Sequence, residues 1–230
     1  MPRNLRIEGY AIVSENGMLT NAAGIMPDSL KFEADQRFFE RGLDGAEVVV
    51  HGRHSHERQP HSHLRRRLIL TRQILDIAAD PSNEKALLWN PAGASFERAL
   101  AALGGPVSTV AVIGGTEAFA MFLDRYDVFH LSRARNVQLI DGRPVFPEVP
   151  TLTPEQVLAS HGLDRSVQHV LDTKNGLAII SCRRLCRSFC SCRGRLLERR
   201  TNRFQCRDCV HDIVSHTDCL ITLLPRSQVQ

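Results

Sequence analysis

The sequence predicts an α/β fold followed by a C-terminal extension of different composition. Short apolar runs that end in glycine or polar turns indicate strands, and an amphipathic segment between two of them has apolar residues at helical spacing. The chain has 230 residues, of which 43% are hydrophobic, enough to bury one substantial core. All seven cysteines lie at residue 182 or beyond it. We therefore expect one α/β domain over residues 1–182 and a separate tail over 183–230.

The N-terminal part is expected to contain a strand and then a helix. Residues 8–17 are typical of a strand that runs into a turn. In residues 28–42 the apolar positions recur among charged ones with the period of a helix. Asp28 or Ser29 is expected to cap this helix, because a short polar side chain can accept a hydrogen bond from the first turn.

Further strands are expected in the middle of the chain, and the most informative one precedes two glycines. Residues 46–51 and 67–72 each contain an apolar run that ends in a polar turn. Residues 110–119 combine an apolar strand, the Gly114-Gly115 pair and the start of a helix. Glycine admits a ligand close to the backbone, and a helix start offers free N–H groups, which together favour a phosphate site. A tight turn alone would also explain the pair.

The domain is expected to end in a hairpin. Its arms are residues 167–171 and 177–181, and the connection contains Asn175-Gly176, which suits a turn that needs positive φ.

The order of these segments resembles dihydrofolate reductase and the wider group that shares its fold, including the reductase domain of RibD-type riboflavin enzymes. The resemblance is carried by seven short matches: Asn16-Gly17-Met18-Leu19, Met26-Pro27, Asp35 with Phe38 and Phe39, Gly52-Arg53-His54-Ser55, Leu70-Thr71-Arg72, Val112-Ile113-Gly114-Gly115 and Phe146-Pro147. It implies a three-layer fold with a mixed, mainly parallel central sheet and flanking helices. It also implies a reductase that moves a hydride from NADPH to a C=N or C=O carbon of a pteridine-like or pyrimidine-derived substrate.

The resemblance further implies which residues hold NADPH. The pyrophosphate or adenosine phosphate would be held by Gly52, Arg53, His54 and Ser55, and from the other side by Gly114, Gly115, Thr116, Glu117 and Ala118. Thr71 and Arg72 would flank the adenosine 2′-phosphate. Two permanently charged guanidinium groups near that dianion favour NADPH over NADH. Glu117 does not suit a phosphate site, because an acidic side chain repels a phosphate.

Asp35 is the expected catalytic residue. It precedes Phe38 and Phe39 by three and four positions, so the carboxylate and the rings share one helix face. Burial beside aromatic rings would raise the pKa of the carboxyl and provide a strong partner for a 2-aminopyrimidinone edge, the role that the resemblance implies. By the same analogy, Ala11, Leu19, Phe39 and Ser132 would line the substrate cleft. The alternative is a solvated aspartate within a run of charges.

The substrate remains open between related molecules. In the resembled family a tryptophan usually follows the Met-Pro pair, whereas Asp28 follows Pro27 here. Dihydrofolate or a similar pteridine is the first expectation, and a ribosylamino-pyrimidine of riboflavin biosynthesis is the second. A nucleotide-binding or zinc-binding module that has kept the fold without turnover is the competing class.

Two groups of metal-ligand residue types are present, and neither is expected to hold a metal. The tail combines Cys190, Cys192, Cys206 and Cys209 with nearby histidines, but only one pair has the C-x-x-C spacing of a zinc ribbon. We expect an unstructured extension there, with zinc binding as the alternative. The second group is the histidine-rich segment 51–63, which lacks an evident carboxylate partner.

The charge balance and the hydropathy bear on partners and location. From Ser181 onward there are ten arginines and four acidic residues, so the net charge of +4 originates in the tail. Few aromatic residues accompany these arginines, so we do not expect nucleic acid as a partner. No apolar run approaches the roughly 20 residues that cross a bilayer. We expect a cytoplasmic protein without membrane contact, whose subunits could pair as a homodimer.

Overall fold

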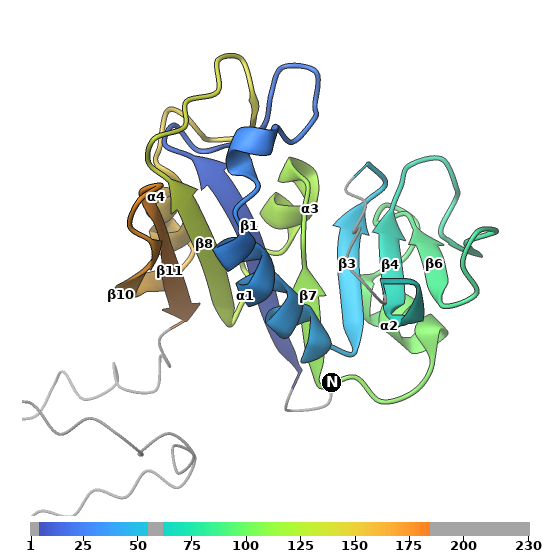
Figure 1. The fold of residues 1–230 in the computed structure, drawn as a ribbon. Helices are drawn as coiled ribbons and strands as arrows, with labels where there is room; N and C mark the ends of the chain where they lie inside the picture. The colour runs from blue at the N-terminus through green and yellow to red at the C-terminus, as the bar shows by residue number, and fades with distance from the viewer. Residues whose placement is uncertain (1–4, 55–61, 185–230) are drawn as a thin grey trace, which may run out of the picture. The chain divides into compact units, whose positions relative to one another are not determined.

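The computed structural model describes residues 5–54 and 62–184, and these residues form three layers. A central sheet carries helix α1 on one face and helices α2, α3 and α4 on the other (Figure 1). The mixed, mainly parallel sheet with flanking helices that the sequence predicted is confirmed.

The central sheet has nine strands within the described residues, in the order β10-β11-β8-β1-β7-β3-β4-β6-β5. The inner strands β8, β1, β7, β3, β4 and β6 run parallel to one another, and the pairs β10–β11, β11–β8 and β5–β6 are antiparallel. The strands are β1 (Arg6–Ser14), β3 (Val48–Gly52), β4 (Arg66–Leu70), β5 (Ile77–Ala79), β6 (Ala86–Trp89), β7 (Thr109–Val112), β8 (Val128–Ala134), β10 (Leu163–Asp172) and β11 (Leu177–Arg184).

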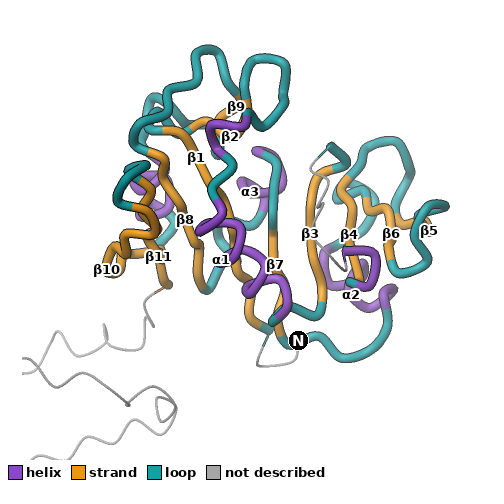
Figure 2. The backbone as a smooth tube through the Cα atoms, viewed as in Figure 1, coloured by secondary structure: helices purple, strands orange, loops and turns teal. Residues whose placement is uncertain are grey.

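A small ribbon lies above the carboxyl ends of the parallel strands, beside several loops (Figure 2). It consists of β2 (Met18–Thr20) and β9 (Arg143–Pro144), which pair antiparallel. Loops at this edge connect each strand to the next element, and such loops carry ligand sites in open α/β sheets.

The predicted helix over residues 28–42 is divided in the structure. A single 3-10 turn, η1 (Asp28–Leu30), is followed by extended backbone at Lys31, and α1 (Glu33–Asp44) begins only after Phe32. The prediction that Asp28 or Ser29 caps the helix was therefore wrong. Phe32 occupies the N-cap position, where no side chain hydrogen-bonds to the first turn.

The other helices cover the opposite face. They are α2 (Phe96–Leu103), α3 (Thr116–Met121) and α4 (Pro154–Ser160), and a second 3-10 turn, η2 (Ser62–Leu64), precedes β4. The main core lies between the sheet and these helices and contains Phe119, Phe129 and Phe146. A smaller core around Tyr10, Leu43, Val49 and Ala111 lies beneath α1.

The C-terminal hairpin is formed as predicted, with Gly176 at φ +64° in its turn. Strand β11 continues to Arg184, two residues beyond the predicted end of the domain. The Arg184 guanidinium donates hydrogen bonds of 2.8–2.9 Å to the carbonyl oxygens of Leu123, Tyr126 and His161. The predicted unstructured tail and its zinc alternative lie outside the described residues, so both remain predictions.

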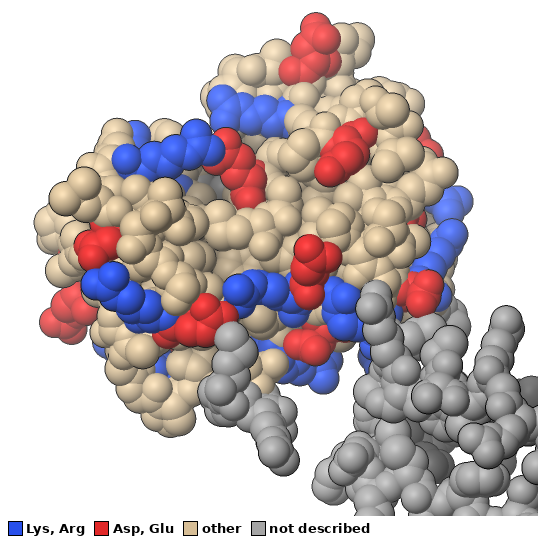
Figure 3. Space-filling view, turned by 180° about the vertical axis from the view of Figure 1, so that it is seen from behind, with Lys and Arg blue, Asp and Glu red and all other residues tan. Residues whose placement is uncertain are grey.

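The surface opposite α1 carries mixed charge. Figure 3 shows basic and acidic side chains interspersed over that face. Within the described part of the chain, none of the helices is both long enough and apolar enough to span a bilayer.

Candidate functional site

The predicted cofactor segments meet at one edge of the sheet. Strands β7, β3 and β4 are neighbours and run parallel, so the residues that follow them lie side by side. The Gly52 N–H donates to the Gly114 carbonyl oxygen at 2.6 Å, and the Arg53 N–H donates to the Leu70 carbonyl oxygen at 3.1 Å. Three segments distant in sequence, 52–54, 71–72 and 114–118, are thus brought together.

The Gly114-Gly115 segment offers backbone donors at this edge. The peptide bond between the two glycines is cis, and Gly114 has φ +126°. The first hydrogen bond inside α3 runs from the Phe119 N–H to the Gly115 carbonyl oxygen at 2.9 Å. The N–H groups of Thr116, Glu117 and Ala118 therefore precede that bond and have no helical acceptor.

Two side chains in this segment, those of Thr116 and Ala118, make contacts within the protein. The Thr116 hydroxyl donates to the Pro144 carbonyl oxygen at 2.5 Å, which ties α3 to the β2–β9 ribbon. The Ala118 side chain is buried in the main core. A ligand phosphate at this segment would consequently contact backbone rather than these two side chains.

Charged side chains surround the same edge. Arg72 and Glu117 form an ion pair of 2.5 Å and are both largely exposed. The Arg53 guanidinium hydrogen-bonds to the Gln73 side chain. His54 lies in the exposed turn after β3, and Ser55, the next predicted contact, lies outside the described residues.

Asp35, in the first turn of α1, is placed against the sheet. Asp35 is partly buried, and desolvation raises the pKa of its carboxyl from 3.8 to about 6, while a hydrogen bond with the Ser132 side chain partly opposes the rise. Ser132 lies on β8 and is 1% exposed. This environment differs from the solvated helix face that was the alternative.

Aromatic residues follow Asp35 along α1 and pack against the sheet. Phe38 packs edge to face on His130 with ring centroids 5.2 Å apart, and Phe39 packs in the same manner on Tyr10 at 6.2 Å. Tyr10 and His130 stack at 4.8 Å. Desolvation lowers the pKa of His130 to about 4 and raises that of Tyr10. The predicted common face of Asp35, Phe38 and Phe39 is therefore directed at β1 and β8.

Two other predicted substrate contacts lie elsewhere. Ala11 pairs with Leu131 in register and packs into the main core, on the face opposite α1. Ile12, its neighbour, pairs with Ser132 and lies on the α1 face. Leu19 is in β2 and packs partly buried against the main core.

Ile113, which directly precedes the glycine pair, was not among the predicted site residues. It packs in the small core beneath α1, next to Phe38 and Phe39. Ile12 on β1 and Ile113 after β7 both pack on the α1 face of the sheet.

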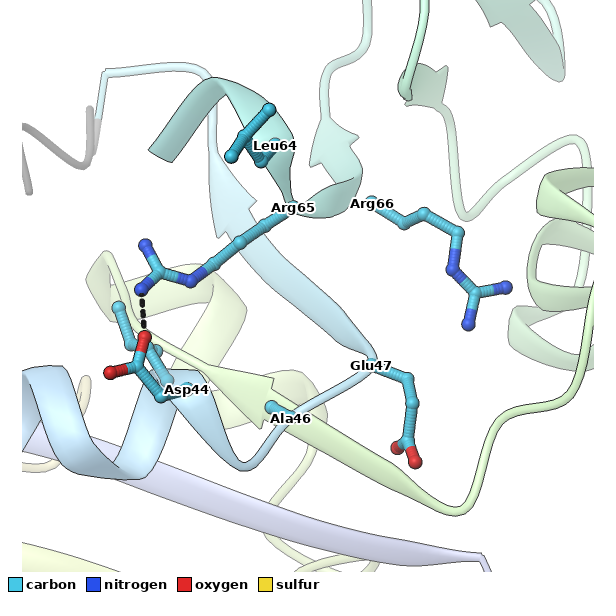
Figure 4. Close-up of a pocket in the computed structure, with 7 residues that line it drawn as sticks. Asp44, Ala46, Glu47, Leu64, Arg65 and Arg66 are labelled. Atoms are coloured by element: carbon cyan, nitrogen blue, oxygen red, sulfur yellow. Dashed lines mark hydrogen bonds and ion pairs between the residues drawn. The ribbon is translucent and has the colours of Figure 1, made fainter. Parts of the chain in front are cut away.

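A cavity of about 400 Å³ lies at the opposite end of β3 and β4 (Figure 4). Its charged groups are engaged within the protein. Arg65 pairs with Asp44 at 2.6 Å, and Glu47 accepts hydrogen bonds of 2.6 Å from the Ser108 hydroxyl and the Thr109 N–H. Arg66 donates to the carbonyl oxygens of Gly104 and Pro106. We therefore place the candidate site at the other edge.

The histidine-rich segment is only partly described. Residues 55–61, which include His56 and His61, lie outside the described ranges. Among the residues that are described, no group of three or more His, Cys, Asp or Glu side chains is arranged to hold a metal ion.

Comparison with known proteins identifies the fold. The sequence matches no protein-family model and no curated protein sequence. A solved protein assigned to riboflavin biosynthesis from Shewanella sp. PV-4 superposes with a TM-score of 0.57 at 16% identity, covering 79% of this chain and 100% of that one. Dihydrofolate reductase from Enterococcus faecalis, solved with NADP(H) and RAB-propyl, gives 0.52 at 19% identity, covering 78% and 96%.

A third similar structure is a longer, two-activity protein. It is the diaminohydroxyphosphoribosylaminopyrimidine deaminase and 5-amino-6-(5-phosphoribosylamino)uracil reductase of Thermotoga maritima, with a TM-score of 0.55 and 14% identity. The match covers 80% of this chain and 57% of that protein. The described domain thus has the dihydrofolate-reductase-like fold.

Proposed function

We propose, from the dihydrofolate-reductase-like fold, that the chain is an NADPH-dependent reductase that transfers a hydride to a pteridine such as dihydrofolate. The observation that carries the proposal is the partly buried Asp35 carboxyl, whose partner Ser132 lies on β8, near the end of β7 that bears Gly114. Only β1 separates these two strands, so they lie about 10 Å apart. That separation suits a flat heterocycle placed between the acid and a cofactor ring.

The donor set at the strand ends suits a dinucleotide. The N–H groups of Thr116, Glu117 and Ala118 would contact a pyrophosphate, and Arg72 would contact an adenosine phosphate. When bound, the cofactor supplies the hydride, so the protein contributes position and electrostatics.

Asp35 would bind the substrate and provide its proton. Its protonated carboxyl can donate to a ring nitrogen, while its second oxygen accepts from an exocyclic amino group. Reduction of a C=N bond adds a hydride to carbon and a proton to nitrogen, and solvent then reprotonates Asp35. A pKa of about 6 keeps a useful fraction of this carboxyl protonated near neutral pH.

A ribosylamino-pyrimidine of riboflavin biosynthesis is the second candidate substrate. One of the similar solved structures is named for riboflavin biosynthesis and another as a phosphoribosylaminouracil reductase, and both give higher TM-scores than the dihydrofolate reductase. Asp28 after Pro27 also departs from the folate enzymes at the loop over the site.

One assay separates the candidates. The purified chain would be mixed with NADPH and either dihydrofolate or the ribosylamino-pyrimidine, and oxidation of the cofactor followed by absorbance. Turnover with one substrate assigns the function. Cofactor binding by thermal shift without any turnover would instead favour a non-catalytic binding module, and absence of both would contradict the proposal.

A further inference from the structure

The ion pair between Arg72 and Glu117 bridges two strand ends that are not adjacent. Arg72 follows β4, and Glu117 lies in the first turn of α3, after β7. Strand β3 lies between β4 and β7, so the pair spans the end of β3, where Gly52 bonds to Gly114. The two side chains therefore meet across the edge at which the three predicted phosphate segments converge.

Both partners are accessible to a ligand. The side chains are 77% and 74% exposed, and their contact distance is 2.5 Å. An exposed pair of this kind contributes little to folding, because solvent screens both charges. The pair still determines the local charge, because the Glu117 carboxylate neutralises the Arg72 guanidinium that would otherwise attract a phosphate.

We propose that Glu117 competes with the 2′-phosphate of the cofactor for Arg72 and thereby sets the selectivity between NADPH and NADH. This inference rests on the proposed function and refines it, because it assigns to an acidic residue the control of cofactor choice. For NADPH to bind, its phosphate must take over the Arg72 contacts while Glu117 turns toward solvent.

The two dinucleotides respond differently to this competition. The 2′-phosphate is a dianion near neutral pH, so it gains most from a free guanidinium and is repelled most by a nearby carboxylate. NADH carries a hydroxyl at the same position and lacks both effects. Glu117 therefore lowers the affinity for NADPH without an equal effect on NADH.

The test is a set of dissociation constants for NADPH and NADH, measured by quenching of tryptophan fluorescence in the full chain. Glu117→Gln should tighten NADPH binding by about three- to tenfold and change NADH binding by less than about twofold. Arg72→Ala should weaken NADPH, and adding Glu117→Gln to it should restore little affinity. Glu97→Gln is the control, since it removes the same charge from another ion pair, the partly exposed Arg125–Glu97 at 2.6 Å.

The outcomes separate the inference from the function on which it rests. If wild type binds NADPH but Glu117→Gln leaves the NADPH to NADH ratio unchanged, the competition is overturned and the reductase proposal stands. An equal gain with and without Arg72 would also overturn it, because simple repulsion would then suffice. If no variant binds either dinucleotide, both proposals fail.

Discussion

The side chains of Asp35 on α1 and Ser132 on β8 share a hydrogen bond in the interface between the helix and the sheet. Desolvation raises the pKa of Asp35 to about 6, and the hydrogen bond with Ser132 stabilises the ionised form and limits the rise. The charge of this carboxyl therefore changes around pH 6. Strongly shifted carboxyl groups inside clefts are candidates for functional residues on physical grounds.

Replacing the Asp35 carboxyl should abolish catalysis but leave the segments proposed to hold NADPH undisturbed. For Asp35→Asn we expect kcat/KM to fall by about a hundredfold or more, because the amide cannot supply the proton. The dissociation constant for NADPH should change by less than about twofold, since the phosphate segments belong to other elements. Steady-state kinetics and fluorescence titration measure the two quantities.

Glu33→Gln is the control on the same helix, because Glu33 is exposed and pairs only with Arg37 one turn later among its described contacts. Its kinetics should match wild type. Equal loss of cofactor binding and turnover in Asp35→Asn would show that the acid is structural.

The pH dependence of kcat/KM should report Asp35. If the protonated carboxyl is the active form, activity is highest below a pKa of about 6 and falls tenfold per pH unit above it. Ser132→Ala removes a hydrogen bond that favours the ionised form, so the inflection should move to higher pH. A profile that stays in place in both Asp35→Asn and Ser132→Ala would exclude Asp35 as its source.

Stability should vary with pH in a related way. In the folded protein Asp35 holds its proton more tightly than in the unfolded chain, because its pKa rises from 3.8 to about 6. The contribution of Asp35 to the free energy of unfolding is therefore fully present below about pH 4 and is lost as the pH rises through about 6. The total loss is about 2 to 3 kcal/mol. Asp35→Asn should unfold at higher urea concentration than wild type at about pH 8, with little difference at about pH 4. A difference independent of pH would contradict this account.

The local elements were predictable because each leaves a short-range signal. The Gly114-Gly115 junction and the hairpin turn at Gly176 depend on backbone conformations that glycine permits. The fold followed from the order of such segments through their resemblance to a known family. The start of α1 was missed because helical spacing continues through Leu30, although the backbone at Lys31 is extended.

The site was less predictable, since its contacts join distant residues. Strand β1 is covered on both faces, so apolar residues occur at successive positions and alternation cannot tell Ala11 from Ile12. The pairing of Arg72 with Glu117 joins residues 45 positions apart and depends on the strand order β7-β3-β4. The burial of Asp35 likewise depends on a strand almost a hundred residues later in the chain.

The position of α1, and with it that of Asp35, should depend on Gly42. A Cβ atom at Gly42 would lie 2.5 Å from the ring of Tyr10, whereas one at Gly45 would have its nearest neighbour at 3.5 Å. Alanine favours a helix over glycine by about 1 kcal/mol, but overpacking of a core costs about 1 to 3 kcal/mol. For Gly42→Ala we therefore expect a net loss of stability in urea unfolding and, because α1 must move away from the sheet, weaker substrate binding. Gly45→Ala, at the end of the same helix, should leave both unchanged, and equal behaviour of the two variants would mean that the Gly42–Tyr10 contact does not fix the helix.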